Sequence, residues 1–172
     1  MAIPALQSFP VANRLAIPNI TLGSVAYSSL GTNTTDINGQ LWITDVWAPF
    51  AKRITSIGVL QGATATTDNI MVMLYDTTGV LLGNSDTAGV TLSGANTFVE
   101  IALLVAVQLY PAQYWVAVQG NGTAAGAIRT IAASTFVDVT TTVVAGTFGT
   151  VPATITIPTT FTAGNGPIVY LK

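Results

Sequence analysis

The sequence predicts an all-β fold: an antiparallel β-sandwich of jelly-roll type that follows an extended N-terminal arm. Short segments rich in Val, Ile, Thr and aromatic residues alternate with turn residues such as Gly, Asn, Asp and Pro. No segment keeps a 3.6-residue apolar period between helix caps, so no long helix is expected. Many short strands with regular turns are typical of a sandwich. The expected strands are Gln40–Val46, Ile54–Leu60, Asn69–Tyr75, Thr97–Leu104, Tyr114–Gln119, Phe136–Val144, Thr154–Ile157 and Ile168–Leu171.

Residues 1–38 are predicted to form the arm, and residues 39–172 the sandwich domain. Prolines at positions 4, 10 and 18 prevent a helix of useful length in the arm. Apolar residues recur there too often for a solvated linker. The arm is therefore expected to lie against its own domain or a neighbouring subunit, with Phe9, Leu15 and Ile17 as candidate partner-binding residues.

Charged residues are rare. The 172 residues include five basic and seven acidic side chains, whereas about a quarter of an ordinary soluble domain is charged. Mean hydropathy is +0.60. The surface is therefore expected to be covered by partners, or to owe its polarity to hydroxyls and amides. A net charge of −2 provides no electrostatic basis for binding nucleic acid or acidic membranes.

Several classes of site are not expected. Without Cys or His, the chain lacks disulfides, thiolate ligands and the commonest general base. The start of the chain has no basic segment typical of a signal peptide. The longest wholly apolar stretch, Ile101–Val107, is far shorter than the ~20 residues of a membrane-spanning helix. We expect no membrane partner, no cofactor and no bound metal.

The acidic residues are scattered, which argues against an enzyme. Asp76 begins the sequence Asp-Thr-Thr-Gly, where Asp at the first turn position bonds the backbone. Glu100 lies among apolar residues, and could pair with Arg53 or Arg129 in an assembled interface or point at solvent. No pair of carboxylates suggests a glycosidase, and no spacing suggests a calcium loop.

Three expected strands are apolar on both faces, although a sandwich strand should alternate apolar and polar residues. A loop or the arm could cover the second face. Alternatively, that face is an interface with a partner or another subunit, which the low charge content favours. The interface candidates are Met71, Met73, Tyr75 and Trp115.

Aromatic residues suggest one possible ligand site. Trp42 and Trp47, together with Tyr110, Tyr114 and Trp115, could form a platform for stacking a sugar ring. Aromatic residues in strands are more often core or interface residues. The Gly120-Asn121-Gly122 sequence is expected to be a hairpin turn.

Several segments together resemble small β-sandwich proteins of tailed-bacteriophage virions. They are Leu-Trp-Ile-Thr-Asp-Val at 41–46, Ile-Thr-Ser-Ile-Gly-Val-Leu-Gln-Gly-Ala at 54–63, Leu-Tyr-Asp-Thr-Thr-Gly at 74–79, Tyr-Trp-Val-Ala-Val-Gln-Gly-Asn-Gly-Thr at 114–123 and Pro-Thr-Thr-Phe-Thr at 158–162. The resemblance covers roughly residues 39–172. Such proteins include head decoration (cement) proteins and appendage modules. The resemblance implies a role but no catalytic residues.

The resemblance implies a decoration subunit made in the host cytoplasm and located on the virion capsid surface. It would self-associate, as a trimer, and bind the major capsid protein partly through its arm. Two other classes remain open: a carbohydrate-binding module of a tail fibre, with an exposed Trp or Tyr near amides, and an accessory domain of a secreted enzyme.

Overall fold

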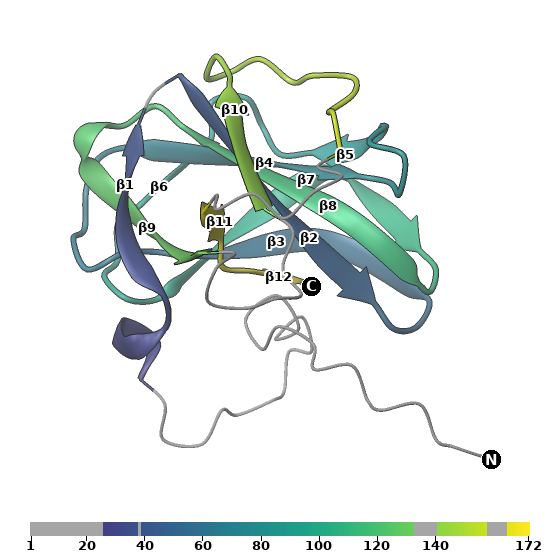
Figure 1. Cartoon of the computed structure of the whole chain (residues 1–172), viewed down its shortest axis with the longest axis horizontal. Helices are drawn as coiled ribbons and strands as arrows, with labels where there is room; N and C mark the ends of the chain where they lie inside the picture. The colour runs from purple at the N-terminus through teal and green to yellow at the C-terminus, as the bar shows by residue number, and fades with distance from the viewer. Residues whose placement is uncertain (1–25, 38, 133–140, 158–164) are drawn as a thin grey trace.

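The structure is a computed structural model that describes residues 26–37, 39–132, 141–157 and 165–172 (Figure 1). The predicted all-β class is confirmed: the described residues form three antiparallel sheets and no helix beyond the short 3-10 turn η1 (Tyr27–Ser29). One sheet has the order β1 (Thr32–Ile37), β9 (Thr123–Ala132), β11 (Asn165–Pro167). The largest has the order β10 (Thr141–Ala145), β2 (Gln40–Ala48), β8 (Ala112–Gly120), β4 (Asn69–Tyr75), β5 (Leu81–Asn84), with β6 (Val90–Thr91) also paired to β4. The third has the order β12 (Val169–Leu171), β3 (Lys52–Leu60), β7 (Phe98–Leu109).

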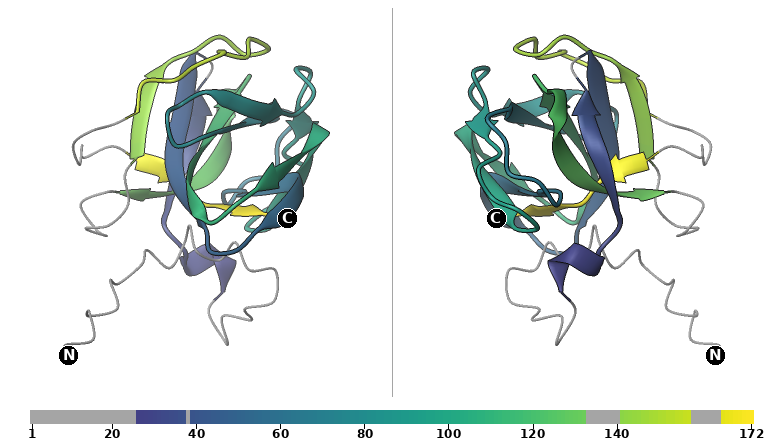
Figure 2. Two further views of the ribbon diagram at one scale, coloured as in Figure 1. Left: turned by 90° about the vertical axis from the view of Figure 1, so that its right-hand side faces the viewer. Right: turned by 90° about the vertical axis from the view of Figure 1, so that its left-hand side faces the viewer.

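The main core lies between the largest sheet and the third sheet, whose ribbons surround it in the side views (Figure 2). Alternate residues of each strand point into it, as the two-residue period of a strand requires. Burial of each such aliphatic side chain contributes about 1.5–3 kcal/mol. The largest sheet contributes Trp42, Val46, Ile70, Val72, Leu74, Val116 and Val118; the third sheet contributes Ile54, Ile57, Val59, Ile101, Leu103, Val169 and Leu171.

A second core lies on the opposite face of the largest sheet, beneath residues 146–157, which follow β10. We call these residues the covering segment. It contacts the turn between β4 and β5: the Ile155 amide donates to the Gly79 carbonyl at 2.9 Å, and the Leu81 amide donates to the Ala153 carbonyl at 3.0 Å. The buried residues of this core are Leu41, Ile43, Met71, Met73, Tyr75, Trp115 and Ala117, and Leu81, Phe148, Val151, Ile155 and Ile157 pack against them.

This cover corrects the interface interpretation of the strands that are apolar on both faces. Met71, Met73 and Tyr75 are fully buried, and Trp115 is 3 % exposed. The covering segment of the same chain takes the place that a partner was expected to occupy. The strand expected over Thr154–Ile157 is correspondingly reduced to a single bridge between Thr154 and Val80.

Residues 26–37 belong to the folded body. β1 pairs with β9 along its length, from Thr32 opposite Thr130 to Ile37 opposite Thr123. The Tyr27 ring packs edge-on against Phe98, with ring centroids 5.3 Å apart. The end of the expected arm is therefore a strand that pairs with β9. Phe9, Leu15 and Ile17 lie outside the described residues.

The Gly120–Gly122 turn differs from the expected hairpin. It leads from β8 in the largest sheet to β9 in the sheet that contains β1, and the two strands do not pair. Asn121 stabilises the crossing, because its Oδ1 accepts a hydrogen bond from the Asn69 amide at 2.6 Å.

Candidate binding surface

Several carboxylates accept hydrogen bonds from backbone amides of the same chain. Asp76 caps its turn, and its Oδ1 accepts from the Thr78 amide at 2.7 Å and the Val80 amide at 3.0 Å. The backbone hydrogen bond from Val80 is the main cause that lowers the Asp76 pKa. Asp68 accepts from the Gly126 amide at 2.9 Å, and Asp86 accepts from the Ala88 amide at 2.8 Å. Within the described ranges, no three acidic side chains gather as metal ligands would.

Glu100 pairs with a residue that was not anticipated. Its carboxylate lies 2.8 Å from the Lys172 ammonium and accepts a 2.8 Å hydrogen bond from the Ser56 hydroxyl. These interactions, that with Lys172 first, lower the Glu100 pKa. Within one chain, the partner of Glu100 is therefore Lys172 and neither Arg53 nor Arg129, and its carboxylate is also partly exposed to solvent. The partly exposed ion pair fastens the end of the chain to β3 and β7.

Trp42 and Trp47 lie on opposite faces of β2, because they are five residues apart on one strand. Trp42 is 5 % exposed and belongs to the main core, whereas Trp47 is 42 % exposed on the outer face. The two rings cannot form one platform, which corrects the predicted sugar site. Of these two tryptophans, Trp47 is the one whose ring is available to a ligand.

Trp47 stands at one end of the molecule, where two connections cross between the facing sheets. The β2–β3 connection and the β7–β8 turn lie side by side there, since Ala48 pairs with Ala112 and Lys52 pairs with Leu109. Each connection carries an exposed aromatic residue, Phe50 at 51 % and Tyr110 at 65 % exposure. We call Trp47, Phe50 and Tyr110 the aromatic end.

Hydrogen bonds hold the β7–β8 turn in shape. The Tyr114 hydroxyl donates to the Tyr110 carbonyl at 3.0 Å and accepts from the Tyr110 amide at 3.1 Å. Tyr114 is itself buried, so it anchors the turn to the core while the Tyr110 ring projects into solvent. The aromatic end is thus displayed by turns fixed to strands.

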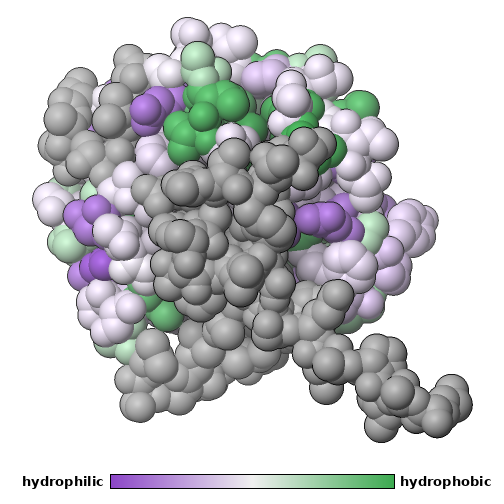
Figure 3. Space-filling view, viewed as in Figure 1, coloured by the Kyte–Doolittle hydropathy of each residue, from purple (hydrophilic) through white to green (hydrophobic). Residues whose placement is uncertain are grey.

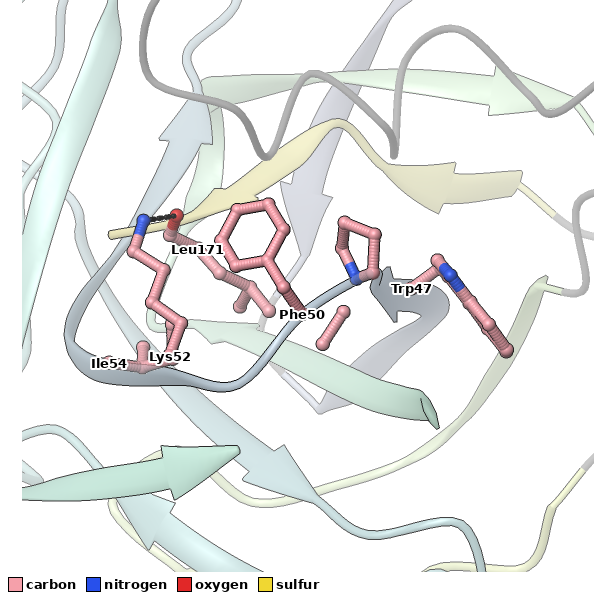
Figure 4. Close-up of a pocket in the computed structure, with 7 residues that line it drawn as sticks. Trp47, Phe50, Lys52, Ile54 and Leu171 are labelled. Carbon is pink, nitrogen blue, oxygen red and sulfur yellow. Dashed lines mark hydrogen bonds between the residues drawn. The ribbon is translucent and has the colours of Figure 1, made fainter. Parts of the chain in front are cut away.

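A shallow hollow opens beside Phe50 (Figure 4). The Phe50 ring lies next to Leu171 and Lys52, and the Trp47 ring lies apart from them and points away. Lys52 brings the one charge, and its Nζ donates to the Leu171 carbonyl at 3.4 Å. The lining is otherwise apolar: Trp47, Ala48, Pro49, Phe50, Ile54 and Leu171.

The surface around these features is mostly neutral. On the face seen in Figure 3, strongly hydrophilic residues are few, and hydrophobic residues gather over the region of β10 and the residues that follow it. Further exposed aliphatic residues lie on β5 and at the irregularity of β7, where β7 carries four residues against one on β3. These residues are Leu82, Leu104 and Val105.

Sequence reasoning named Trp47 and Tyr110 but missed Phe50. Pro49 and Phe50 lie in the short connection between β2 and β3, where the apolar–polar alternation of β2 ends. An aromatic residue next to a proline in such a short connection is a sequence pattern that could have identified Phe50 as exposed.

No protein-family model matches this chain, and no curated protein or solved structure matches it either. The described part of the chain contains no helix long and apolar enough to cross a membrane.

Proposed function

We propose that the chain is a structural protein of a tailed-bacteriophage virion, a head decoration subunit that binds and stabilises the capsid surface. In this proposal it has no catalytic activity and needs no cofactor. Its partners are the major capsid protein and further copies of itself, assembled as a trimer, and not nucleic acid or a membrane. The finer jelly-roll topology and the N-terminal attachment arm belong to the same proposal.

The aromatic end is the observation that carries the proposal. Trp and Tyr dominate the residues that contribute most to protein–protein binding, because each ring buries a large area with few rotatable bonds. Trp47, Phe50 and Tyr110 are all well exposed at one end of a β scaffold. A fully buried aromatic side chain removes about 150–250 Å² from water, and against a capsid subunit each of these rings would lose the roughly half of its surface that is still exposed.

The charge content supports the same conclusion. A chain with only twelve charged side chains has little to keep it apart from other molecules in solution. In an assembled particle much of this surface would be covered by neighbours. The exposed Leu82, Leu104 and Val105 are the candidates for contacts between copies, in place of the buried Met71 and Met73.

The test is co-sedimentation of the purified chain with phage particles that lack it. We expect saturable binding by the wild type and a loss of at least about tenfold in affinity for a Phe50→Ala/Tyr110→Ala variant, which corresponds to about 1.4 kcal/mol or more. Val144→Ala is the matched control, since Val144 is exposed on β10 outside the aromatic end. Equal binding by the double variant and the wild type would refute the role of the aromatic end.

A further inference from the structure

Trp47 lies beside two polar side chains of the β2–β8 pair, Gln113 and Asp45. Gln113 is its direct cross-strand partner, so both side chains lie on the outer face of the β2–β8 pair. Asp45 lies on the same face, two residues before Trp47. The Gln113 Nε2 donates to the Asp45 Oδ2 at 3.1 Å. An exposed indole therefore stands beside a hydrogen-bonded amide–carboxylate pair.

These three side chains match the chemistry of one class of ligand. A carboxylate beside the ring disfavours an anionic ligand such as a phosphate. A purely apolar ligand could form no hydrogen bond with the amide or the carboxylate. A neutral sugar ring has both an apolar face of C–H groups and a rim of hydroxyls, and so can use the whole patch.

We propose that Trp47, Gln113 and Asp45 form a binding site for one ring of a neutral sugar. The C–H face of the sugar stacks on the indole of Trp47. One hydroxyl donates to the Asp45 carboxylate, whose two oxygens offer about four acceptor positions. Another hydroxyl donates to the Gln113 Oε1, since the Nε2 of that amide is engaged with Asp45.

The site is held in place before any ligand arrives. Asp45 and Gln113 belong to the eight-residue register of β2 with β8, and both are half-buried. Because their mutual hydrogen bond restrains the two side chains, little conformational entropy is lost on binding. One stacking ring and two hydroxyl contacts are expected to give a dissociation constant of about 1 mM, equivalent to about 4 kcal/mol.

The test uses the full chain labelled with ¹⁵N and titrated with the methyl glycosides of glucose, galactose, mannose and N-acetylglucosamine. The signals followed are the indole N–H groups of the three tryptophans. With at least one glycoside we expect a saturable shift of the signal that is missing in Trp47→Ala. Gln113→Ala should weaken binding roughly tenfold. Tyr27→Ala is the matched control, because it removes a ring of similar exposure, 45 % against 42 % for Trp47, that lies outside the aromatic end and should leave the affinity unchanged.

Three results would overturn the proposal. One is the absence of a saturable Trp47 shift with every glycoside up to about a hundred times the expected dissociation constant. Another is unchanged binding by Gln113→Ala and by Asp45→Asn, which retain Trp47. The third is an equal loss in Tyr27→Ala, which would indicate contact with any exposed ring. The capsid-binding test depends on Phe50 and Tyr110 and the sugar test on Gln113, so either proposal can fail without the other.

Discussion

Two halves of the outer face of the largest sheet differ in burial. Along β2 and β8, the half that contains Ile43 and Trp115 is sealed beneath the covering segment, while the half that contains Trp47 and Gln113 is open to solvent. Both halves carry a tryptophan on the outer face. The difference arises because the covering segment, which is distant in sequence, extends over one half and not the other. The local sequence pattern of β2 and β8 does not distinguish the buried half from the exposed half.

The cover is held by backbone hydrogen bonds as well as by apolar contacts. The Tyr75 hydroxyl donates to the Pro152 carbonyl at 3.0 Å, and burial raises the Tyr75 pKa to about 12. Ile155 is bonded to Gly79 in the β4–β5 turn. The sealed half is thus as much a part of the fold as the main core.

Truncating the two outer-face tryptophans should give the largest contrast between the halves. We expect Trp115→Ala to lower the free energy of unfolding by about 3–5 kcal/mol, because a large cavity opens beneath the covering segment. Trp47→Ala should cost less than about 1 kcal/mol, since the ring is already half in solvent. Urea unfolding followed by circular dichroism measures both values. Similar losses for the two variants would mean that the halves do not differ in burial.

Alanine substitution at two glycines tests how closely the covering segment contacts the β4–β5 turn. Gly79 has φ +85° and Gly149 has φ +84°, so alanine is strained at both. A Cβ at Gly79 would also strike the Ile155 carbonyl, whereas at Gly149 the nearest atom is the Thr87 carbonyl oxygen at 3.8 Å. We expect a loss of about 1 kcal/mol for Gly149→Ala and at least about 2 kcal/mol for Gly79→Ala.

The measurement is again urea unfolding, in which the midpoint concentration should fall while the dependence of the unfolding free energy on urea concentration stays the same. If the two alanine variants were equally stable, close contact between the cover and the β4–β5 turn would be refuted.

Tyr75→Phe should have the smallest effect at neutral pH, about 1 kcal/mol, from the lost hydrogen bond to Pro152. Its pH dependence is more informative. The unfolded chain releases the phenolic proton near pH 10, whereas the folded chain keeps it until about pH 12. The unfolded state therefore binds fewer protons in this range, and stability falls as the pH rises above 10.

The wild type should lose about 2 kcal/mol more than Tyr75→Phe between pH 10 and pH 12. Stability curves for the two proteins at a series of pH values measure this difference. Curves that stay parallel above pH 10 would show that Tyr75 is accessible to solvent.

Strong local patterns predicted much of the fold. The strand over Asn69–Tyr75 was located to the residue, and those around β2, β3 and β8 within two residues at each end, whereas β7 runs five residues past its expected end at Leu104. β9 was missed because its first half is rich in Ala and Gly, which favour strands weakly. β1 fell within the expected arm, because Thr-Asn-Thr-Thr-Asp lacks the alternating apolar residues that would have marked a strand; its pairing with β9 is a long-range contact that no local pattern reports.

The candidate site was less predictable. The sequence identified Trp47 but paired it with Trp42, although five residues on a strand place the two on opposite faces. The mistaken interface at Met71 and Met73 has a different cause. Their cover comes from residues more than seventy positions later, and no local period reports such a long-range contact. The pairing of Gln113 with Trp47 likewise depends on strand register.

Hydroxyl-radical footprinting with mass spectrometry tests the central claim most directly, because it reads both halves of the face in one experiment. In the free protein, Trp47, Phe50 and Tyr110 should be oxidised rapidly, whereas Met71, Met73 and Trp115 should remain unmodified despite the high intrinsic reactivity of methionine. On particles, the three residues of the aromatic end should become protected. Rapid oxidation of Met71 and Met73 in the free protein, or an aromatic end equally reactive on the particle, would contradict the account.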